Sequence, residues 1–205
     1  MELVRTATAA GITTLTLDSP ANRNALSTPL MRELLDALAA ALTDPLVRLV
    51  VLSHTGPVFC SGADLKETGD ARPDGRLPVE MAGDLLAAIW EFPKPVVARV
   101  AGPARAGGLG LIAAADIAVC TTDATFAFSE VRLGLIPAVI SATVLPRLAP
   151  RAAAELYLTG EVFDGVRAEI AELAERSAGY FRSMEGREGM AAYREKRAAS
   201  WVPAE

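Results

Sequence analysis

Apolar residues near the start of the chain follow first a strand-like and then a helix-like spacing. Residues 3–8 and 12–17 alternate between apolar and polar side chains on either side of a short turn, which predicts an antiparallel hairpin. Leucines then recur at every fourth position from 30 to 42, a spacing that places them on one face of a helix. Thr28 is the expected cap of this helix, with Pro29 at its first position.

A longer pattern follows and occurs twice. A β-branched and leucine-rich run at 47–52 predicts a buried strand, and a glycine-bearing stretch at 57–64 comes soon after it. Residues 96–100 predict a second strand, which leads into a glycine-rich turn at 102–110 and a short helix that ends near Ala115. A strand followed by a glycine turn is therefore expected at two places in the chain.

The remaining elements complete an α/β chain with one core. We expect a mobile surface loop at 66–78, a helix at 79–90, strands at 117–120 and 125–128, and helices interrupted by prolines from about 141 onward. The charged, alanine-rich stretch 167–197 predicts peripheral helices. No low-complexity linker separates two units, so residues 1–160 are expected to form the core and residues 161–205 a terminal helical segment.

Composition narrows the classes of function. The 205 residues are 51% hydrophobic, and no apolar stretch approaches the roughly 20 residues that cross a bilayer, so we expect a cytoplasmic protein without membrane contact. The net charge of −5 leaves no basic field for nucleic acid. Cys60 and Cys120 make no disulfide framework, and the single histidine excludes most metal sites. We interpret this histidine, His54, as a polar residue at a strand end.

Two glycine-bearing turns carry the chemistry that the sequence indicates. Residues 59–66 read FCSGADLK and residues 101–111 read AGPARAGGLGL, and each comes after an expected strand. The start of a helix leaves about four N–H groups without partners, and together with the helix dipole they favour a negatively charged oxygen. Two such turns that converge would bind one oxyanion.

These turns and three further segments resemble the enoyl-CoA hydratase/isomerase superfamily, also called the crotonase family, from Thr6 to about Gly165. The further segments are SPANRNALS at 19–27, KPVVARVAG at 94–102 and FAFSEVRLGLIP at 126–137. The resemblance implies an α/β, crotonase-like (ClpP/crotonase) fold, a right-handed spiral of repeated ββα units. Family chains commonly carry a further strand and helix after 159–165, so a reduced carboxy-terminal helical region is expected here.

The resemblance also implies a site for an acyl-CoA thioester. It places the two amides that hold the thioester oxygen at Ala63 and Gly107, and the catalytic acid/base at Glu130. The alternative for Glu130 is a surface ion pair with Arg132. Substrate contacts are implied at Ala21, Arg23, Ser61, Ala63, Asp64, Leu65, Lys66, Gly107 and Gly110. The two cations among these residues have the charge to meet the phosphates of CoA.

Gly110 is the main departure from the family pattern. Family hydratases usually place a second glutamate at this position, and water addition is easiest with two carboxylates. Hydration of a 2-enoyl-CoA is narrowly the favoured expectation. Isomerisation of an enoyl-CoA by Glu130 alone is the first alternative, and a non-catalytic acyl-CoA-binding subunit is the second. Arg105 stands where relatives carry an apolar residue, and we interpret it as a contact for a carboxylated acyl group.

The implied chemistry needs no metal and no redox cofactor, because dipoles and one carboxylate suffice to stabilise an enolate, and CoA is part of the substrate. The carboxy-terminal helices of the family close the acyl pocket and build a trimer interface. A homo-oligomer, as a trimer or a dimer of trimers, is therefore the expected assembly.

Two other enzyme classes fit parts of the sequence less well. GLGLIA at 108–113 matches a dinucleotide-binding fingerprint, but only about six residues separate Gly110 from the next strand, and a parallel crossover needs a dozen or more. A serine hydrolase would need Ser61 or Ser129 beside His54, and neither serine lies in a GxSxG motif. Oxyanion chemistry on a CoA thioester is therefore the leading prediction.

Overall fold

The structure is a computed structural model that describes residues 2–67 and 77–167, together with 187–188, 191–192, 195–197 and 200. The expected surface loop at 66–78 and the expected terminal helices at 167–197 lie largely outside these residues. All five segments that carry the family resemblance lie inside them.

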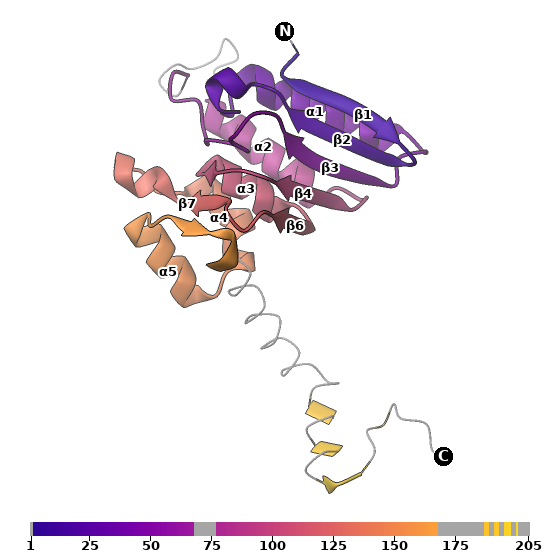
Figure 1. The fold of residues 1–205 in the computed structure, drawn as a ribbon, viewed down its shortest axis with the longest axis vertical. Helices are drawn as coiled ribbons and strands as arrows, with labels where there is room; N and C mark the ends of the chain where they lie inside the picture. Colours follow the sequence, from indigo (N-terminus) through magenta and orange to yellow (C-terminus); the bar gives the residue numbers. More distant parts are fainter. Residues whose placement is uncertain are drawn as a thin grey trace.

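A five-stranded sheet forms the scaffold, in the order β1-β2-β3-β4-β6 (Figure 1). β1 and β2 form the expected antiparallel hairpin, and the other neighbours run parallel. Each parallel pair is joined through a segment that contains a helix, as parallel connections usually are. The strands are β1 (Val4–Ala9), β2 (Ile12–Leu17), β3 (Leu49–His54), β4 (Val96–Val100) and β6 (Ile117–Cys120).

Helices cover one face of this sheet (Figure 1). The helices on this face are α1 (Thr28–Thr43), α2 (Pro78–Trp90) and α3 (Gly107–Ala114), with α4 (Ala138–Val144) packed on α2 and α3. α5 (Pro150–Thr159) lies apart from this sheet (Figure 1). α1 packs against β1, β2 and α2, and α3 packs against both α2 and α4. No described helix is both long and apolar enough to span a bilayer.

The first helix shows how leucine spacing produces this packing. Leu30, Leu34 and Leu38 are at most 2% exposed, because their spacing keeps them on one face of α1. The expected cap was wrong by one residue. The N-cap is Ser27, which has an extended backbone and whose Oγ accepts a hydrogen bond from Leu30 N at 3.4 Å, while Thr28 is already helical.

A second, smaller sheet has the order β5-β7-β8 and consists of β5 (Ala104–Arg105), β7 (Thr125–Ala127) and β8 (Phe163–Asp164). β5 and β7 run parallel, and β8 is antiparallel to β7. β8 was not predicted, because a strand of two residues shows no periodicity. Short 3-10 helices lie at η1 (Pro20–Asn22), η2 (Ser129–Leu133) and η3 (Leu145–Arg147).

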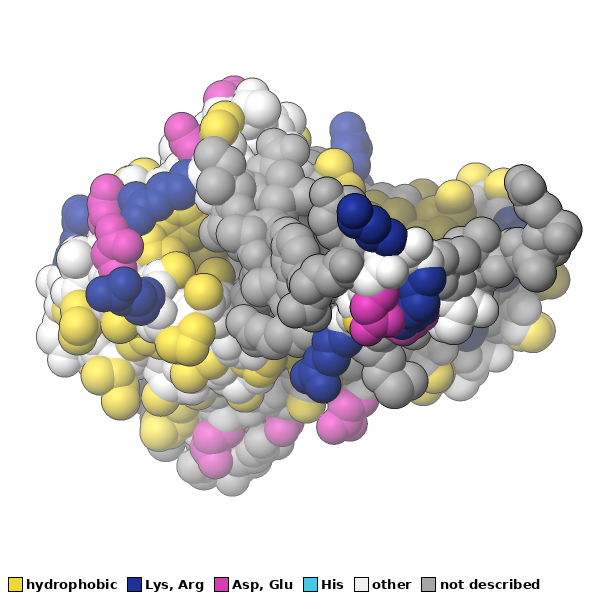
Figure 2. All heavy atoms as spheres, turned by 90° about the horizontal axis from the view of Figure 1, so that it is seen from below, with side chains coloured by type: hydrophobic (Ala, Val, Ile, Leu, Met, Phe, Trp, Pro, Cys, Tyr) yellow, Lys and Arg dark blue, Asp and Glu magenta, His cyan; other side chains and the backbone are white. Residues whose placement is uncertain are grey.

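Apolar side chains are exposed on two parts of the surface. On β6, whose outer edge pairs with no strand among the described residues, Ile117 is 52% and Val119 is 56% exposed. Figure 2 shows the molecule from below, where hydrophobic side chains gather on one side of the visible surface. Exposed apolar residues in and around α5 are Leu145, Leu158, Val162 and Val166. The described core thus leaves apolar surface uncovered at β6 and around α5.

Candidate active site

Three parallel chain segments bring the three residues expected to be catalytic to one end of the smaller sheet. Cys60 pairs with Ala104, and Ala104 pairs with Phe126, so these three residues lie on one line across the segments. Because the segments run parallel, the positions that follow this line lie on the same side of it. Those positions, three or four residues further along each segment, are Ala63, Gly107 and Glu130.

The two expected oxyanion amides lie close together. A β-carbon placed on Gly107 would be 3.9 Å from Ala63 N, and one placed on Gly62 would be 3.5 Å from Gly107 N. Within the described residues, neither Ala63 N nor Gly107 N has a hydrogen-bond acceptor. Gly107 is the first residue of α3, where a helix leaves its N–H groups unpaired, and Ala63 is exposed. Both donors are therefore available to one ligand oxygen.

Glycine is required where the two turns touch. Gly62 has a φ of +93°, which residues with a side chain rarely adopt, and a β-carbon there would lie 2.9 Å from Ala106 Cβ. Ala106 itself has a φ of +48° and a ψ of −117°, a strained conformation for alanine. A hydrogen bond from Ala106 N to Ala127 O, 3.2 Å long, helps to hold this conformation immediately before Gly107.

Glu130 lies in η2, shortly after β7, and is partly buried. Its Oε2 atom is buried and has no hydrogen-bond partner in the described part of the chain. Burial raises the pKa of this carboxyl above its ordinary value, against a smaller lowering by a backbone hydrogen bond. No ion pair joins Glu130 to Arg132 among the described residues, so the surface ion pair is not supported. A carboxyl group of this kind exchanges protons closer to neutral pH.

The leucines that follow Glu130 in the sequence do little to bury it. Leu133 and Leu135, which the sequence places nearby, are 56% and 55% exposed. Tyr157 of α5 lies close enough for the charge of Glu130 to add to the effect of burial, and both raise the pKa of the tyrosine hydroxyl. The Tyr157 ring packs against the buried Phe128 ring in a tilted arrangement, with their centres 4.6 Å apart. One side of the carboxylate site is therefore supplied by α5.

Gly110 lies where α3 packs most closely against its neighbours. A β-carbon on Gly110 would be 2.7 Å from Ile140 Cγ2 and 3.1 Å from Leu86 Cδ1. The Thr143 hydroxyl also donates to Gly110 O at 3.2 Å, which fastens α4 to α3. The space that a second carboxylate would enter is therefore filled by two apolar side chains.

The two segments expected to contact CoA are joined to each other. Asn22 Nδ2, in the turn that contains Ala21 and Arg23, donates to Asp64 Oδ2 at 2.8 Å. Arg23 follows Asn22 in one segment, Lys66 comes two residues after Asp64 in the other, and both are exposed. The hydrogen bond holds together two segments that are about 40 positions apart in the sequence.

The guanidinium of Arg105 is occupied within the fold. It donates to the backbone carbonyls of Ala104 and Thr125 and to the Thr125 hydroxyl. Burial lowers the pKa of the group, with a further small effect from Arg132. Arg105 thus joins β5 to β7, and we do not retain its interpretation as a contact for an acyl carboxylate.

His54 and Cys60 have structural surroundings. His54 Nε2 accepts a hydrogen bond from Ala101 N at 3.1 Å, and burial lowers the pKa of the ring. No hydrogen bond joins it to a serine in the described part of the chain, which disfavours a serine hydrolase. Burial raises the pKa of the Cys60 thiol to about 12, so the thiolate that reacts as a nucleophile is absent near neutral pH.

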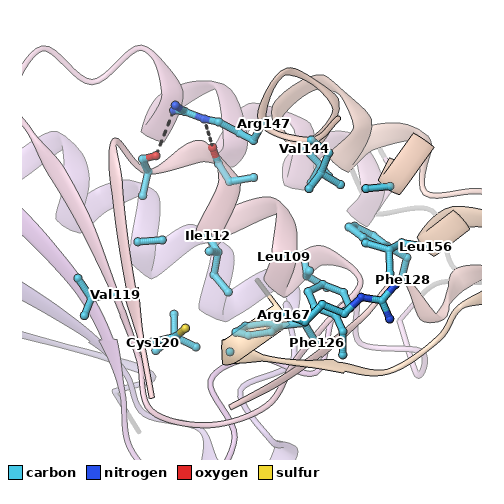
Figure 3. A pocket seen from close by; sticks show the side chains of 18 of the residues that line it. Leu109, Ile112, Val119, Cys120, Phe126, Phe128, Val144, Arg147, Leu156 and Arg167 are labelled. Atoms are coloured by element: carbon cyan, nitrogen blue, oxygen red, sulfur yellow. Dashed lines mark hydrogen bonds between the residues drawn. The ribbon is translucent and has the colours of Figure 1, made fainter. Parts of the chain in front are cut away.

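A cavity lies beside α3, on the side of Leu109 and Ile112 (Figure 3). It has a volume of about 710 Å³ and includes none of the residues predicted for the site. Leu109 and Ile112 point into it from α3, with Val119 of β6 and Phe126 of β7 on further walls (Figure 3). At its rim, Arg147 donates to the carbonyls of Ala113 and Ala115.

The structure thus has two turns with unpaired amides and a partly buried carboxylate on three segments that share one register line. The sequence profile described as Enoyl-CoA hydratase/isomerase matches residues 7–173. The chain belongs to the enoyl-CoA hydratase/isomerase family. Enoyl-CoA hydratase EchA19 of Mycobacterium tuberculosis is 38% identical over 152 residues, 71% of this chain and 57% of that protein.

Other relatives show how much of a family chain is present. The mitochondrial enoyl-CoA hydratase domain-containing protein 2 of Homo sapiens is 35% identical over 191 residues, 92% of this chain and 64% of that protein. An enoyl-CoA hydratase from Mycobacterium avium, of known crystal structure, has a TM-score of 0.74 at 38% identity, over 98% of this chain and 100% of that chain. The crotonase-like α/β fold is confirmed. The sequence matches span less than two thirds of either curated relative.

Proposed function

We propose that this protein adds water to a 2-enoyl-CoA thioester, with Glu130 as acid/base and the amides of Ala63 and Gly107 as the oxyanion site. The observation that carries the proposal is the buried Oε2 atom of Glu130, which has no partner in the described chain and lies beyond the same register line as two unpaired amides. Such a carboxylate is available to take a proton from water. Relatives named enoyl-CoA hydratase support the same reaction.

The proposed reaction proceeds through an enolate. The thioester oxygen accepts hydrogen bonds from Ala63 N and Gly107 N, and Glu130 takes a proton from water as the oxygen of that water bonds to C3. The electrons of the double bond move toward the thioester oxygen, where the two amides stabilise the negative charge. Glu130 then returns its proton to C2. Loss of one oxyanion donor typically slows such a reaction by about 10²–10³-fold.

The bound CoA is proposed to run along the contact between the two joined segments. Arg23 and Lys66 would meet its phosphates, while Ala21, Asp64 and Leu65 would line its path and Ser61 would lie beside the thioester.

A homo-oligomer, as a trimer or a dimer of trimers, and a cytoplasmic location stay predictions. Light scattering of the purified full chain tests the assembly.

One experiment separates the three functions that the sequence left open. Purified protein is mixed with crotonyl-CoA, or with a 3-enoyl-CoA, while the absorbance of the conjugated thioester is recorded. Loss of absorbance from crotonyl-CoA supports hydration, and a gain from the 3-enoyl substrate supports isomerisation. No change with either substrate, together with CoA-thioester binding, would show a non-catalytic subunit and contradict the proposal.

Isomerisation is the second candidate, and the wall at Gly110 favours it. Because Ile140 and Leu86 fill that space, position 110 supplies no second carboxylate beside Glu130. A single carboxylate can take a proton from C2 of a 3-enoyl thioester and return it to C4, which moves the double bond into conjugation. This reaction uses the same enolate and needs no activated water.

A further inference from the structure

Asn24 is a buried polar residue whose side-chain oxygen and nitrogen atoms both form hydrogen bonds. It is 0% exposed. Its Oδ1 atom accepts from Ser19 N at 2.7 Å, and its Nδ2 atom donates to Thr55 O at 3.0 Å and Val58 O at 2.8 Å. The side chain thus joins the turn before α1 to the loop after β3. Both are among the segments that lead to the proposed site.

The turn that contains Asn24 does not have an intrinsically preferred shape. Arg23 and Asn24 both have a φ of +51°, in the left-handed region, and neither is glycine. This conformation is unfavourable for residues with a side chain, though less so for asparagine. Two consecutive residues of this kind persist only where surrounding contacts hold them. The three hydrogen bonds of the Asn24 side chain are such contacts.

The same turn is hydrogen-bonded to the stretch that ends at Ala63. Ser61 N donates to Arg23 O at 3.1 Å, and Leu26 N donates to Gly62 O at 2.8 Å. These two bonds lie on either side of Asn24 in the sequence. On its other edge, the stretch is held by Arg105 N, which donates to Cys60 O at 2.9 Å. The position of Ala63 N therefore depends on the turn on one side and on the second glycine loop on the other.

We propose that Asn24 is a positioning residue, whose side chain fixes the Arg23–Leu26 turn and through it aims the Ala63 amide at the thioester oxygen. The inference rests on the proposed function, since it assigns a ligand to that amide. Asn24 does not touch the substrate. Its loss displaces a donor that remains chemically intact.

Asn24→Asp is the most direct variant. Aspartate keeps the size, the tolerance for positive φ and the acceptor for Ser19 N, but it places carboxylate oxygen opposite the carbonyls of Thr55 and Val58. We expect kcat to fall roughly tenfold to a hundredfold, less than the ~10²–10³-fold cost of losing an oxyanion donor outright. KM should change much less than kcat, because the residues that meet CoA are unchanged.

A spectroscopic signature separates positioning from a general loss of stability. Cinnamoyl-CoA has a conjugated thioester whose absorbance moves to longer wavelength when hydrogen bonds polarise its carbonyl. The wild type should show this shift on binding, and folded Asn24→Asp should show a smaller one. Circular dichroism at the same temperature establishes that the variant is folded.

Lys94→Met is a matched control. Lys94 Nζ donates to two backbone carbonyls, of Ala41 and Asp44, as Asn24 Nδ2 does, but outside the predicted site residues. This variant should unfold at a lower temperature and keep both the absorbance shift and kcat. An equal loss of shift in Lys94→Met would show that the signal reports stability only, and would overturn the inference.

The remaining outcomes are distinct. No shift in the wild type contradicts the proposed function itself. A wild-type shift that folded Asn24→Asp reproduces in full, with unchanged kcat, overturns the positioning role alone. If Asn24→Asp does not fold, Asn24→Gly, which allows positive φ without the side-chain bonds, takes its place. Failure of both to fold would show that Asn24 serves folding and would equally overturn the inference.

Discussion

The two faces of α3 differ in how they are packed. On one face, Gly110 lies so close to Ile140 and Leu86 that not even a β-carbon fits. On the other, Leu109 and Ile112 look into a cavity of about 710 Å³ that extends to the exposed strand β6. The helix that begins at the proposed oxyanion residue is thus held tightly on the side of α2 and α4 and loosely on the side of β6.

This contrast indicates what each face can contribute to function. Closely packed groups keep a fixed position, which electrostatic stabilisation of a transition state requires. The open face holds none of the predicted site residues, and its apolar surface has no cover among the described residues. We therefore expect substitutions on the closed side and at the site to change activity or stability strongly, and substitutions on β6 to change them little.

The largest effect is expected at the carboxylate. Glu130→Gln should lower turnover of the active substrate by about 10²–10⁴-fold, because the side chain can no longer accept a proton. The conjugated-thioester absorbance assay measures this directly. Turnover within threefold of the wild type would remove Glu130 from the mechanism.

The pH dependence should follow the raised pKa of Glu130. The base must be ionised, so kcat/KM should fall as the pH drops, with a midpoint above the ordinary carboxyl value of 4.5. A raised pKa means that the folded chain binds the proton more tightly than the unfolded chain. Stability is therefore lost as the pH rises through this window.

Glu130→Gln provides the matching control for pH. The variant lacks this titration, so its stability relative to wild type should increase between acid and neutral pH. Urea unfolding at several pH values checks the sign. A relative stability that falls with pH would show that the carboxyl is not held in a desolvated place.

Packing at Gly110 comes next in size. Gly110→Ala should destabilise the fold by about 1–3 kcal/mol through overpacking against Ile140. Combining it with Ile140→Ala should cost less than the sum of the single changes, because the clash is removed, with a coupling of about 0.5–3 kcal/mol. Denaturant unfolding of the four proteins of this cycle measures the coupling.

A second glycine serves as the control for this experiment. Gly83 lies in α2, and a β-carbon there would meet only Val139 Cγ1 at the ordinary distance of 3.9 Å. Gly83→Ala should therefore be neutral or stabilising by up to about 1 kcal/mol. Equal destabilisation by both alanines would contradict the tight packing inferred for Gly110.

The smallest effect is expected on the open face. Val119→Lys replaces a side chain that is 56% exposed at the edge of the sheet. The free energy of unfolding should change by no more than about 0.5 kcal/mol. Thermal unfolding at low protein concentration tests this, and a large loss of stability would show that β6 is covered in solution.

Sequence patterns predicted the strands of the larger sheet, because the spacing of apolar residues that marks such a strand is local. The runs at 96–100 and 117–120 match β4 and β6 to the residue. Two-residue β8 was missed, since it exists only through its pairing with β7. The sequence predicted the cap at Thr28 in place of Ser27, because threonine is also a favoured capping residue and stands next to it.

The site likewise contains residues that the sequence could predict and residues that it could not. The glycine turns and Glu130 could be predicted from the order of the motifs. The structure adds that the amides of Ala63 and Gly107 are unpaired, and that these two residues and Glu130 follow paired positions on three parallel segments. The roles of Asn24, Leu86 and Ile140 could not be predicted, because each depends on contacts with residues more than 20 positions away. An asparagine in a polar turn and two apolar residues in helices carry no local mark of such contacts.

We propose above all that the amides of Ala63 and Gly107 polarise one thioester carbonyl. Butyryl-CoA labelled with ¹³C at the carbonyl cannot be hydrated, and its infrared stretch can be recorded in the bound state by difference from the unlabelled compound. We predict that this stretch moves to lower frequency on binding than in water. A bound carbonyl that absorbs at or above its frequency in water would contradict this role of the two amides.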